Sequence, residues 1–195
     1  MRFDKEALFW DEKPRRVELG KAVSEYVNKF VDNNTEILDF GCGTGLVSLN
    51  FCDKVKQIVG VDLSCEMVNI YNEKAKKIEC KAKAICEDVK NINSEFDIIV
   101  SSMVFHHIEN IEEMLNVLSS KLKPNGKLFI ADLFEEDGTF HEHGNDGVFH
   151  YGFKKDSFFN KNFEIEDFKK IYTINKNKNY DVFLWRLSLK NNNLI

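Results

Sequence analysis

An apolar segment that runs directly into a glycine-rich turn is the feature that most restricts the fold of this chain. Residues 37–40 are apolar apart from Asp39, and Gly41, Gly43 and Gly45 follow at alternate positions. Glycine adopts positive φ and lets a ligand approach the backbone, because it has no Cβ. In α/β sheets, a turn of this kind between a strand and a helix is where nucleotide-like ligands bind. We therefore expect a strand over 36–40, a ligand-binding loop and a helix over 44–52.

The rest of the chain alternates in the way that such a sheet requires. Short apolar segments are separated by segments of helical periodicity, which predicts parallel strands joined by helices. The expected strands are residues 36–40, 57–62, 80–85, 96–101 and 126–132, and the expected helices between them are 44–52, 64–78 and 110–122. Small apolar residues alternate with lysine over 80–84, which indicates an edge strand. Residues 96–100 are almost continuously apolar, which indicates a central strand.

The two ends of the chain follow other patterns. Residues 15–30 have helical periodicity and are expected to pack outside the sheet. Residues 133–152 are polar and rich in glycine and histidine, and a loop of this length is usually functional. Beyond it we expect a helix over 154–160 and an antiparallel hairpin made of strands 163–176 and 180–190.

Composition limits the class of protein. The chain has 195 residues, of which 43% are hydrophobic and 30% charged, as in one globular domain. The 27 Lys and Arg against 32 Asp and Glu give a net charge of −5, which favours a small-molecule partner over nucleic acid. No apolar segment is long enough for a membrane span, and the charged start is unlike a signal peptide, so we expect a cytoplasmic protein. The five cysteines are scattered and expected to be reduced thiols.

Details of the loop and of the acids after it bear on the ligand. The glycine spacing is G-x-G-x-G, and Leu46 stands where a dinucleotide-binding loop has its third glycine. Asp39, so close to the bend, would repel a diphosphate and attract an amine. Asp62 ends the second expected strand, the position of a carboxylate that binds ribose hydroxyls. A nucleotide-cofactor oxidoreductase is therefore disfavoured but stays an alternative.

These residues, taken in order, resemble the class I S-adenosylmethionine-dependent methyltransferases. The resemblance rests on residues 36–47, 59–64, 86–89, 96–103, 106–108 and 122–128. It implies a Rossmann-like, doubly wound, mostly parallel seven-stranded sheet with an antiparallel last strand and helices on both faces. It also implies S-adenosylmethionine as the cofactor and S-adenosylhomocysteine as the product. We expect a single domain, with a helical lid over 1–34, a cofactor-binding half over 35–132, and the acceptor loop and hairpin over 133–195.

The resemblance implies a role for each cofactor-site residue. Asp39 would lie near the methionine amine and Asp62 would hold the ribose diol. Leu63 would cover one face of adenine and Asp88 would accept from its amino group. The backbone of Ser101 would close the methionine side. The implied cofactor-binding residues are Asp39, Gly41, Cys42, Gly43, Asp62, Leu63, Asp88, Val89 and Ser101.

The acceptor side is less defined. The expected catalytic or acceptor-contacting residues are His106, His107, His141 and His143. No bound metal is expected, although an alternative is that the loop residues His141, His143, His150 and Asp146 hold one. Aromatic residues near the N-terminus would exclude water, and Arg15 or Arg16 would pair with the methionine carboxylate.

The expected function is transfer of a methyl group to a small-molecule acceptor by direct displacement. Such a reaction depends mainly on alignment, so a general base is needed only if the acceptor must lose a proton. The alternative is a non-catalytic protein that binds S-adenosylmethionine or S-adenosylhomocysteine. A protein or RNA acceptor is disfavoured by the negative charge. We expect a monomer or homodimer, and the sequence leaves the acceptor and the methylated atom open.

Overall fold

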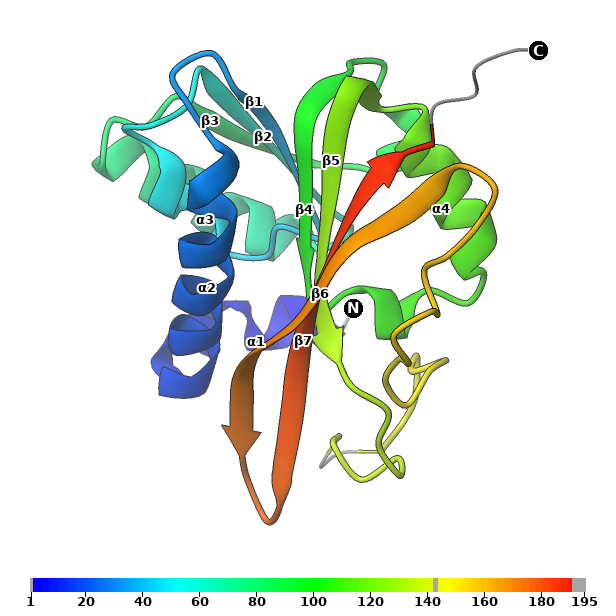
Figure 1. Ribbon diagram of the computed structural model, residues 1–195. Coiled ribbons are helices and arrows are strands. Elements are labelled where there is room, and N and C mark those ends of the chain that lie inside the picture. The colour runs from blue at the N-terminus through cyan, green and yellow to red at the C-terminus, as the bar shows by residue number, and fades with distance from the viewer. Residues whose placement is uncertain (1, 142–143, 191–195) are drawn as a thin grey trace, which may run out of the picture.

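Seven strands form one sheet in the order β3-β2-β1-β4-β5-β7-β6 (Figure 1). The computed structural model describes residues 2–141 and 144–190. Strands β1 to β5 are parallel, and β7 is antiparallel to both of its neighbours. The predicted fold class, the edge position of the third strand and the central position of the fourth are confirmed. The strands are β1 Glu36–Phe40, β2 Gln57–Asp62, β3 Ala82–Cys86, β4 Phe96–Ser102, β5 Leu122–Leu133, β6 Phe163–Asn175 and β7 Asn179–Leu189.

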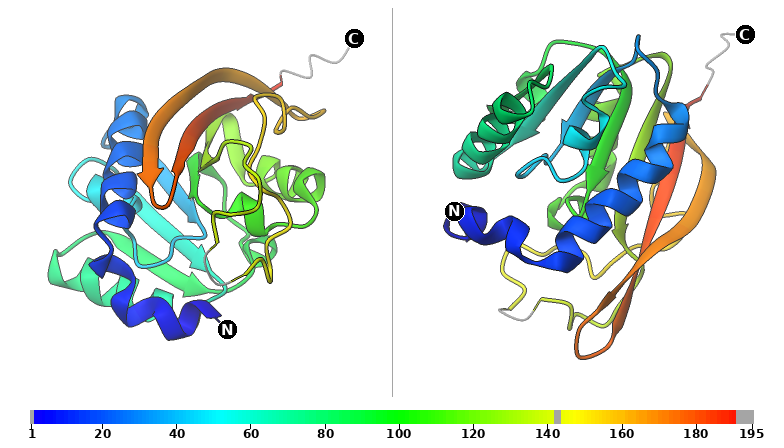
Figure 2. Two further views of the ribbon diagram at one scale, coloured as in Figure 1. Left: turned by 90° about the horizontal axis from the view of Figure 1, so that it is seen from below. Right: turned by 90° about the vertical axis from the view of Figure 1, so that its left-hand side faces the viewer.

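Helices cover both faces of the sheet (Figures 1 and 2). Helices α2 and α3 lie on one face and α4 lies on the opposite face. In α2, Leu19, Val23 and Val27 recur every four residues and are buried, so one side of the helix packs on the core. The α-helices are α1 Arg2–Glu6, α2 Pro14–Val27, α3 Cys65–Lys77 and α4 Ile111–Ser119, and the 3-10 turns are η1 Ala7–Glu12, η2 Asn28–Phe30, η3 Ser48–Phe51, η4 Val89–Asn91 and η5 Phe105–His107.

The central strands bury both of their faces. Ile37 of β1 packs into the cluster that contains the buried side of α2. Its neighbour Leu38 points to the other face and packs into the cluster that contains Leu115 and Leu118 of α4. Because successive side chains alternate between the two faces, a strand covered on both sides reads as a nearly continuous apolar segment, as residues 37–40 of β1 and 96–100 of β4 do apart from Asp39 and Asp97.

Two predicted helices are wrong. Residues 44–52 contain only the short turn η3, because Gly45 adopts a φ of +85° and the Asn50 side chain donates to the backbone carbonyls of Leu46 and Val47 at 2.8 and 3.2 Å. Residues 154–160 form turns instead of a helix. There the Ser157 hydroxyl accepts from the Lys154 N–H at 2.9 Å, and Asn160 accepts from the backbone beyond it. In both segments a polar side chain bonds to nearby backbone groups in a local turn.

The expectation of reduced thiols is also wrong. Cys52, which follows η3, is disulfide-bonded to Cys80, which precedes β3, and their Cα atoms are 5.1 Å apart. Cys65 at the start of α3 is disulfide-bonded to Cys86 at the end of β3, with a Cα separation of 5.0 Å. Cys42 is the free cysteine and is buried. Both bridges therefore join β3, the edge strand, to segments that lead into or out of its neighbours.

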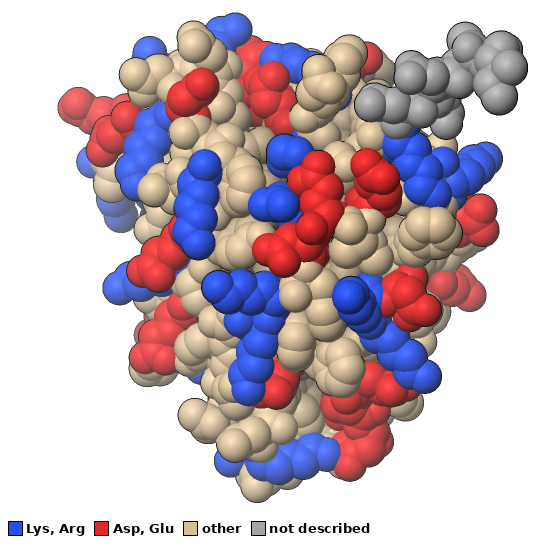
Figure 3. All heavy atoms as spheres, viewed as in Figure 1, with Lys and Arg blue, Asp and Glu red and all other residues tan. Residues whose placement is uncertain are grey.

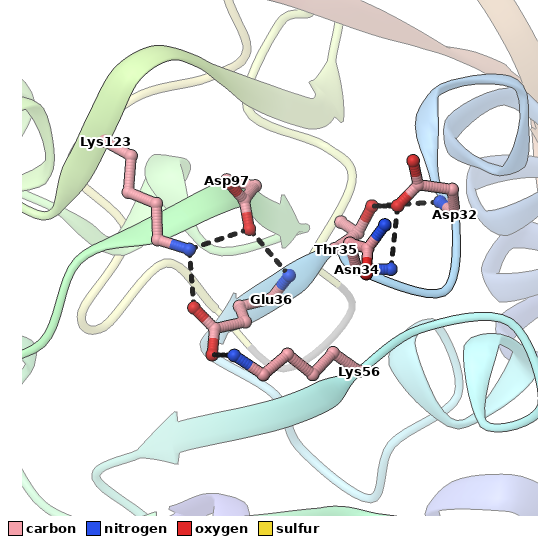
Figure 4. A network of polar contacts seen from close by, with 7 residues as sticks. All are labelled: Asp32, Asn34, Thr35, Glu36, Lys56, Asp97 and Lys123. Atoms are coloured by element: carbon pink, nitrogen blue, oxygen red, sulfur yellow. Dashed lines mark hydrogen bonds and ion pairs between the residues drawn. The ribbon is translucent and has the colours of Figure 1, made fainter.

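An ion-pair network ties the amino-terminal ends of the parallel strands together (Figure 4). The Lys123 ammonium contacts the carboxylate of Glu36 and lies 2.9 Å from that of Asp97. Lys56 lies 2.9 Å from Glu36 on its other side, and these two lysines hold the pKa of Glu36 below its usual range. The nearby Asp32 carboxylate accepts from Asn34 and Thr35 in the turn before β1. The network thus lies at the end of the sheet opposite to the glycine loop.

The surface in the view of Figure 1 carries both signs of charge. Lysine and arginine side chains are interspersed with aspartate and glutamate over this face (Figure 3). Within residues 2–141 and 144–190, none of the helices has the length and apolar character that crossing a membrane requires.

Candidate active site

A cavity of about 400 Å³ lies at the carboxyl ends of β1, β2 and β4. The glycine loop after β1, the end of β2, the turn after β3 and the segment after β4 surround it, and the N-terminal residues Phe3, Trp10 and Arg16 close one side. The residues predicted to bind the cofactor that line this cavity are Asp39, Gly41, Cys42, Gly43, Asp62, Leu63, Asp88 and Val89. Ser101 is fully buried in β4, and its neighbour Ser102 lines the cavity instead.

The glycine loop turns sharply under the cavity. Gly41 has a φ of +71°, and a Cβ built on it would lie 2.2 Å from the Cγ2 atom of Val104. Gly43 has a φ of +50°, and a Cβ there would meet no described atom within 4 Å. The first glycine is therefore required by packing as well as by conformation, whereas the second leaves open space beside the loop.

Asp39 is a buried carboxylate on the floor of this cavity. The residue is 2% exposed, and its Oδ2 atom has no hydrogen-bond partner among the described residues. Burial raises the pKa of Asp39 to about 7, and hydrogen bonding to Ser48 opposes that shift. An unpaired buried acceptor of this kind is rare in proteins. A cationic donor in the cavity would satisfy it.

Asp62, at the end of β2, is held by the backbone on both of its oxygens. Its Oδ2 accepts from the Gly43 N–H at 2.8 Å and its Oδ1 from the Ser64 N–H at 2.9 Å. Burial raises the pKa of Asp62, and these two hydrogen bonds oppose the shift. Each carboxylate oxygen can accept a second hydrogen bond. The geometry therefore suits a ligand with two adjacent hydroxyls.

The far end of the cavity combines an exposed apolar side chain with an acid. Leu63 lines the cavity and is 60% exposed. Val89 also lines the cavity and is buried. The Asp88 carboxylate accepts from the Lys90 N–H at 2.9 Å and so caps η4. A flat ring with an exocyclic amine would cover Leu63 and reach Asp88.

The N-terminal segment is attached to the sheet beside the cavity. The Ser64 hydroxyl, which caps α3, donates to Asp4 at 2.6 Å. Asp11 lies 2.7 Å from the Lys74 ammonium. Arg16 lies 3.4 Å from the centre of the Trp10 ring and 2.9 Å from Glu6, and it lines the cavity, whereas Arg15 does not. The predicted pairing of an arginine with the methionine carboxylate stays a prediction, for which Arg16 is better placed.

A second, smaller cavity of about 140 Å³ adjoins the first. Both are lined by Phe3, Trp10, Arg16, Leu19, Met103 and His107, so they meet at these residues. Three of the predicted acceptor-side histidines, His106, His107 and His141, line the smaller cavity. His143 lies outside the described residues. The ring of His150 points elsewhere, with its Nε2 donating to the Ile108 carbonyl at 2.9 Å.

Sequence reasoning missed two residues of this region. Asp132 belongs to β5 and lies beside the segment that follows β4. Its Oδ1 lies 2.7 Å from Nδ1 of the buried His106. The two residues are 26 positions apart, and only the parallel pairing of β4 with β5 brings them together. Met103, between the two cavities, has a φ of +60°, which is costly for a non-glycine residue. The only signal in the sequence was that neighbouring parallel strands end at the same edge.

Comparisons with known proteins agree with this geometry. A family model described as a methyltransferase domain matches residues 11–177. The chain is 42% identical over 144 residues to the uncharacterized methyltransferase C1347.09 of Schizosaccharomyces pombe, a match that covers 65% of this chain and 51% of that protein. The chain spans about half the length of the curated relatives it matches.

Solved structures share the fold. An S-adenosylmethionine-dependent methyltransferase from Clostridium acetobutylicum superposes with a TM-score of 0.65 at 20% identity, over 94% of this chain and 95% of that one. The magnesium protoporphyrin IX methyltransferase of Synechocystis, solved with S-adenosylmethionine bound, gives a TM-score of 0.67 at 18% identity, over 89% of this chain and 80% of that one. Since the family model spans most of the chain, from the N-terminal segment to the hairpin, the protein belongs to the methyltransferase-domain family.

Proposed function

We propose that this protein is an S-adenosylmethionine-dependent methyltransferase that acts on a small-molecule acceptor. The observation that carries the proposal is the unpaired, buried Oδ2 atom of Asp39 at the floor of the larger cavity. A cationic donor would satisfy that atom, and the ammonium group of the methionine part of the cofactor is such a donor. A dinucleotide would instead place a diphosphate beside this carboxylate.

Different residues of the cavity would bind different parts of the cofactor. Asp39 would hold the ammonium group, Asp62 the ribose hydroxyls, and Asp88 the adenine amine, with Leu63 against the ring. When bound, S-adenosylmethionine would supply an activated methyl group, which passes to the nucleophilic atom of the acceptor while S-adenosylhomocysteine leaves. The protein aligns the two reactants, and alignment can supply roughly 7–11 kcal/mol of the barrier lowering. The N-terminal segment would exclude water from the site as a lid.

The smaller cavity would hold the acceptor, and its charge indicates the acceptor's class. Among the residues that the structure describes, its lining includes Lys13, Arg15, Arg16 and Lys176 and one acid, Glu6, in a protein whose net charge is −5. A concentration of positive charge against the sign of the whole molecule favours an anionic ligand. We therefore infer a small acceptor that carries a carboxylate or a similar anion. His106 and His107 would lie beside its reacting atom.

The location and assembly of the protein stay predictions. We retain the cytoplasm and a monomer or homodimer as the expected state, with one domain over the whole chain. The two disulfides are unusual for a reducing compartment. Counting the free thiols of the protein in the cell would therefore test the expected cytoplasmic location, where all five cysteines should be reduced.

Calorimetry with two ligands tests the proposed function. We expect S-adenosylhomocysteine to bind with a dissociation constant on the order of micromolar, about −8 kcal/mol. NAD should not bind measurably, because its diphosphate would lie against Asp39. Tighter binding of NAD than of S-adenosylhomocysteine would refute the proposal.

The affinity for S-adenosylhomocysteine should depend on pH through Asp39. Its pKa is raised to about 7, so the carboxyl is protonated below that pH and cannot pair with an ammonium group. Affinity is therefore expected to rise with pH up to about 7 and to fall by up to about tenfold for each unit below it. In the empty protein the sign is opposite: ionisation of Asp39 lowers the free energy of unfolding as pH rises. Titrations from acidic to neutral pH, with Asp39→Asn as the control, check this, and an equal slope in the variant would exclude Asp39 as the source.

A further inference from the structure

Three histidines from distant parts of the chain converge on one wall of the smaller cavity. His106 and His107 belong to η5, and His141 comes from the loop after β5. One ring nitrogen from each lies within 4.8 Å of the nitrogens of the other two. The ring centres are 4.1 Å apart for His106 and His107, and 5.2 and 5.7 Å from these to His141. Three imidazoles this close would repel one another if they were all protonated.

The hydrogen bonds of two of these rings indicate which ring nitrogen carries the proton. Nδ1 of His107 lies 2.6 Å from the Gly147 carbonyl oxygen, which can only accept, so Nδ1 carries the proton. Nδ1 of His106 lies 2.7 Å from the Asp132 carboxylate, which also accepts. In a neutral imidazole the other nitrogen, Nε2, then holds the lone pair. Metal-ligating histidines have this arrangement, in which a carboxylate or carbonyl holds the second nitrogen.

The carboxylate of Asp132, which contacts His106, also favours a bound cation. Asp132 is 0% exposed and His106 is 2% exposed. The Asp132 carboxylate also accepts from the N–H groups of His106 and Leu133, as an ionised group would. A buried negative charge is costly unless a positive charge lies near it. A divalent cation bound through Nε2 of His106 would supply that charge without the need to protonate the ring.

We propose that His106, His107 and His141 bind a divalent transition-metal ion, with Zn²⁺ as the best match. Three histidines at about 2.0–2.1 Å leave a fourth position open, which is the form of a reactive rather than a structural zinc site. This site differs from the absence of metal expected from the sequence, and from the alternative set that included His150.

The open position would face the cavity that we assign to the acceptor. There the ion would bind a hydroxyl oxygen of the acceptor and lower its pKa, so that the hydroxyl loses its proton to water near neutral pH. The resulting oxyanion would take the methyl group, with S-adenosylhomocysteine as the leaving group. Lys13 and Arg15 would neutralise the rest of the acceptor's negative charge. This use of the ion rests on the proposed function, whereas binding of the ion does not.

Zinc titration by calorimetry, on protein without an affinity tag and first treated with a chelator, tests the site. We expect one zinc ion per chain for the unmodified protein, and binding weakened by more than about tenfold in both His107→Gln and His141→Gln. His150→Gln is the matched control, because it changes a histidine of the same loop whose Nε2 is already bonded to Ile108, and it should bind zinc as the unmodified protein does. Absence of zinc binding, or equal binding by all the variants, would overturn the proposal.

X-ray absorption at the zinc edge of the unmodified protein keeps the test independent of the variants' folding. Nitrogen ligands at about 2.0–2.1 Å support the histidine site, whereas sulfur ligands at about 2.3 Å would overturn it and assign the ion to cysteines. Neither experiment contains cofactor or acceptor. A protein that binds S-adenosylhomocysteine but not zinc would therefore lose this proposal and keep the proposed function.

Discussion

Gly41→Ala is expected to lower the free energy of unfolding by about 2–5 kcal/mol. Two costs add at this position. The left-handed conformation at a φ of +71° is unfavourable for alanine, and the new Cβ would lie 2.2 Å from a methyl carbon of Val104. Val104 is β-branched and has few other rotamers, so it cannot easily move aside. Urea denaturation of the purified variant measures the loss.

Gly43→Ala is the matched control for Gly41→Ala. It lies two residues later in the same loop and also has a positive φ, but a Cβ there meets no described atom within 4 Å. Its loss should be only the conformational cost, about 1–2 kcal/mol. Equal losses for the two variants would show that the contact with Val104 does not restrict the loop.

Asp62→Ala is expected to weaken S-adenosylhomocysteine binding by about 1.5–3 kcal/mol, or roughly 10- to 150-fold. The variant removes the carboxylate that we propose accepts from two ribose hydroxyls, and it also releases the N–H groups of Gly43 and Ser64. Calorimetry at neutral pH measures the affinity, and a denaturation curve separates this effect from unfolding.

Asp53→Ala provides the comparison for Asp62→Ala. Asp53 is an exposed aspartate that does not line the cavity, so its removal changes the net charge equally. Its affinity for S-adenosylhomocysteine should match that of the unmodified protein. If Asp62→Ala folds and binds as tightly as Asp53→Ala does, Asp62 is not part of the cofactor site.

The sequence predicted the sheet well because its signals are local. The composition of a strand depends mainly on whether one or both of its faces are buried. The apolar segments of β1 and β4 therefore indicated burial of both faces, and the small residues alternating with lysine before and within β3 indicated an exposed face. The glycine loop was predictable for a similar reason, since positive φ at Gly41 and Gly43 favours glycine over other residues. The helix expected over 44–52 failed because periodicity does not register Asn50 bonding back to the backbone.

What the sequence could not give depends on residues far apart in the chain. The Cys52–Cys80 and Cys65–Cys86 pairs are separated by 28 and 21 positions, and spacing alone does not decide whether thiols meet. His141 joins His106 only through the path of a loop that lacks regular structure. The individual histidines were predictable as acceptor-side residues, but their grouping was not.

The Cys65–Cys86 bridge has a consequence for the energetics of the nucleoside pocket. Cys65 follows Leu63 and Ser64 directly, and Cys86 stands two residues before Asp88. The covalent link therefore restrains the distance between Leu63, which we propose contacts a purine ring, and Asp88, which we propose accepts from the amine of that ring. Ordering two loops around a ligand normally subtracts from affinity. Here the bridge joins the two segments when the chain folds, so less of that ordering is left for ligand binding.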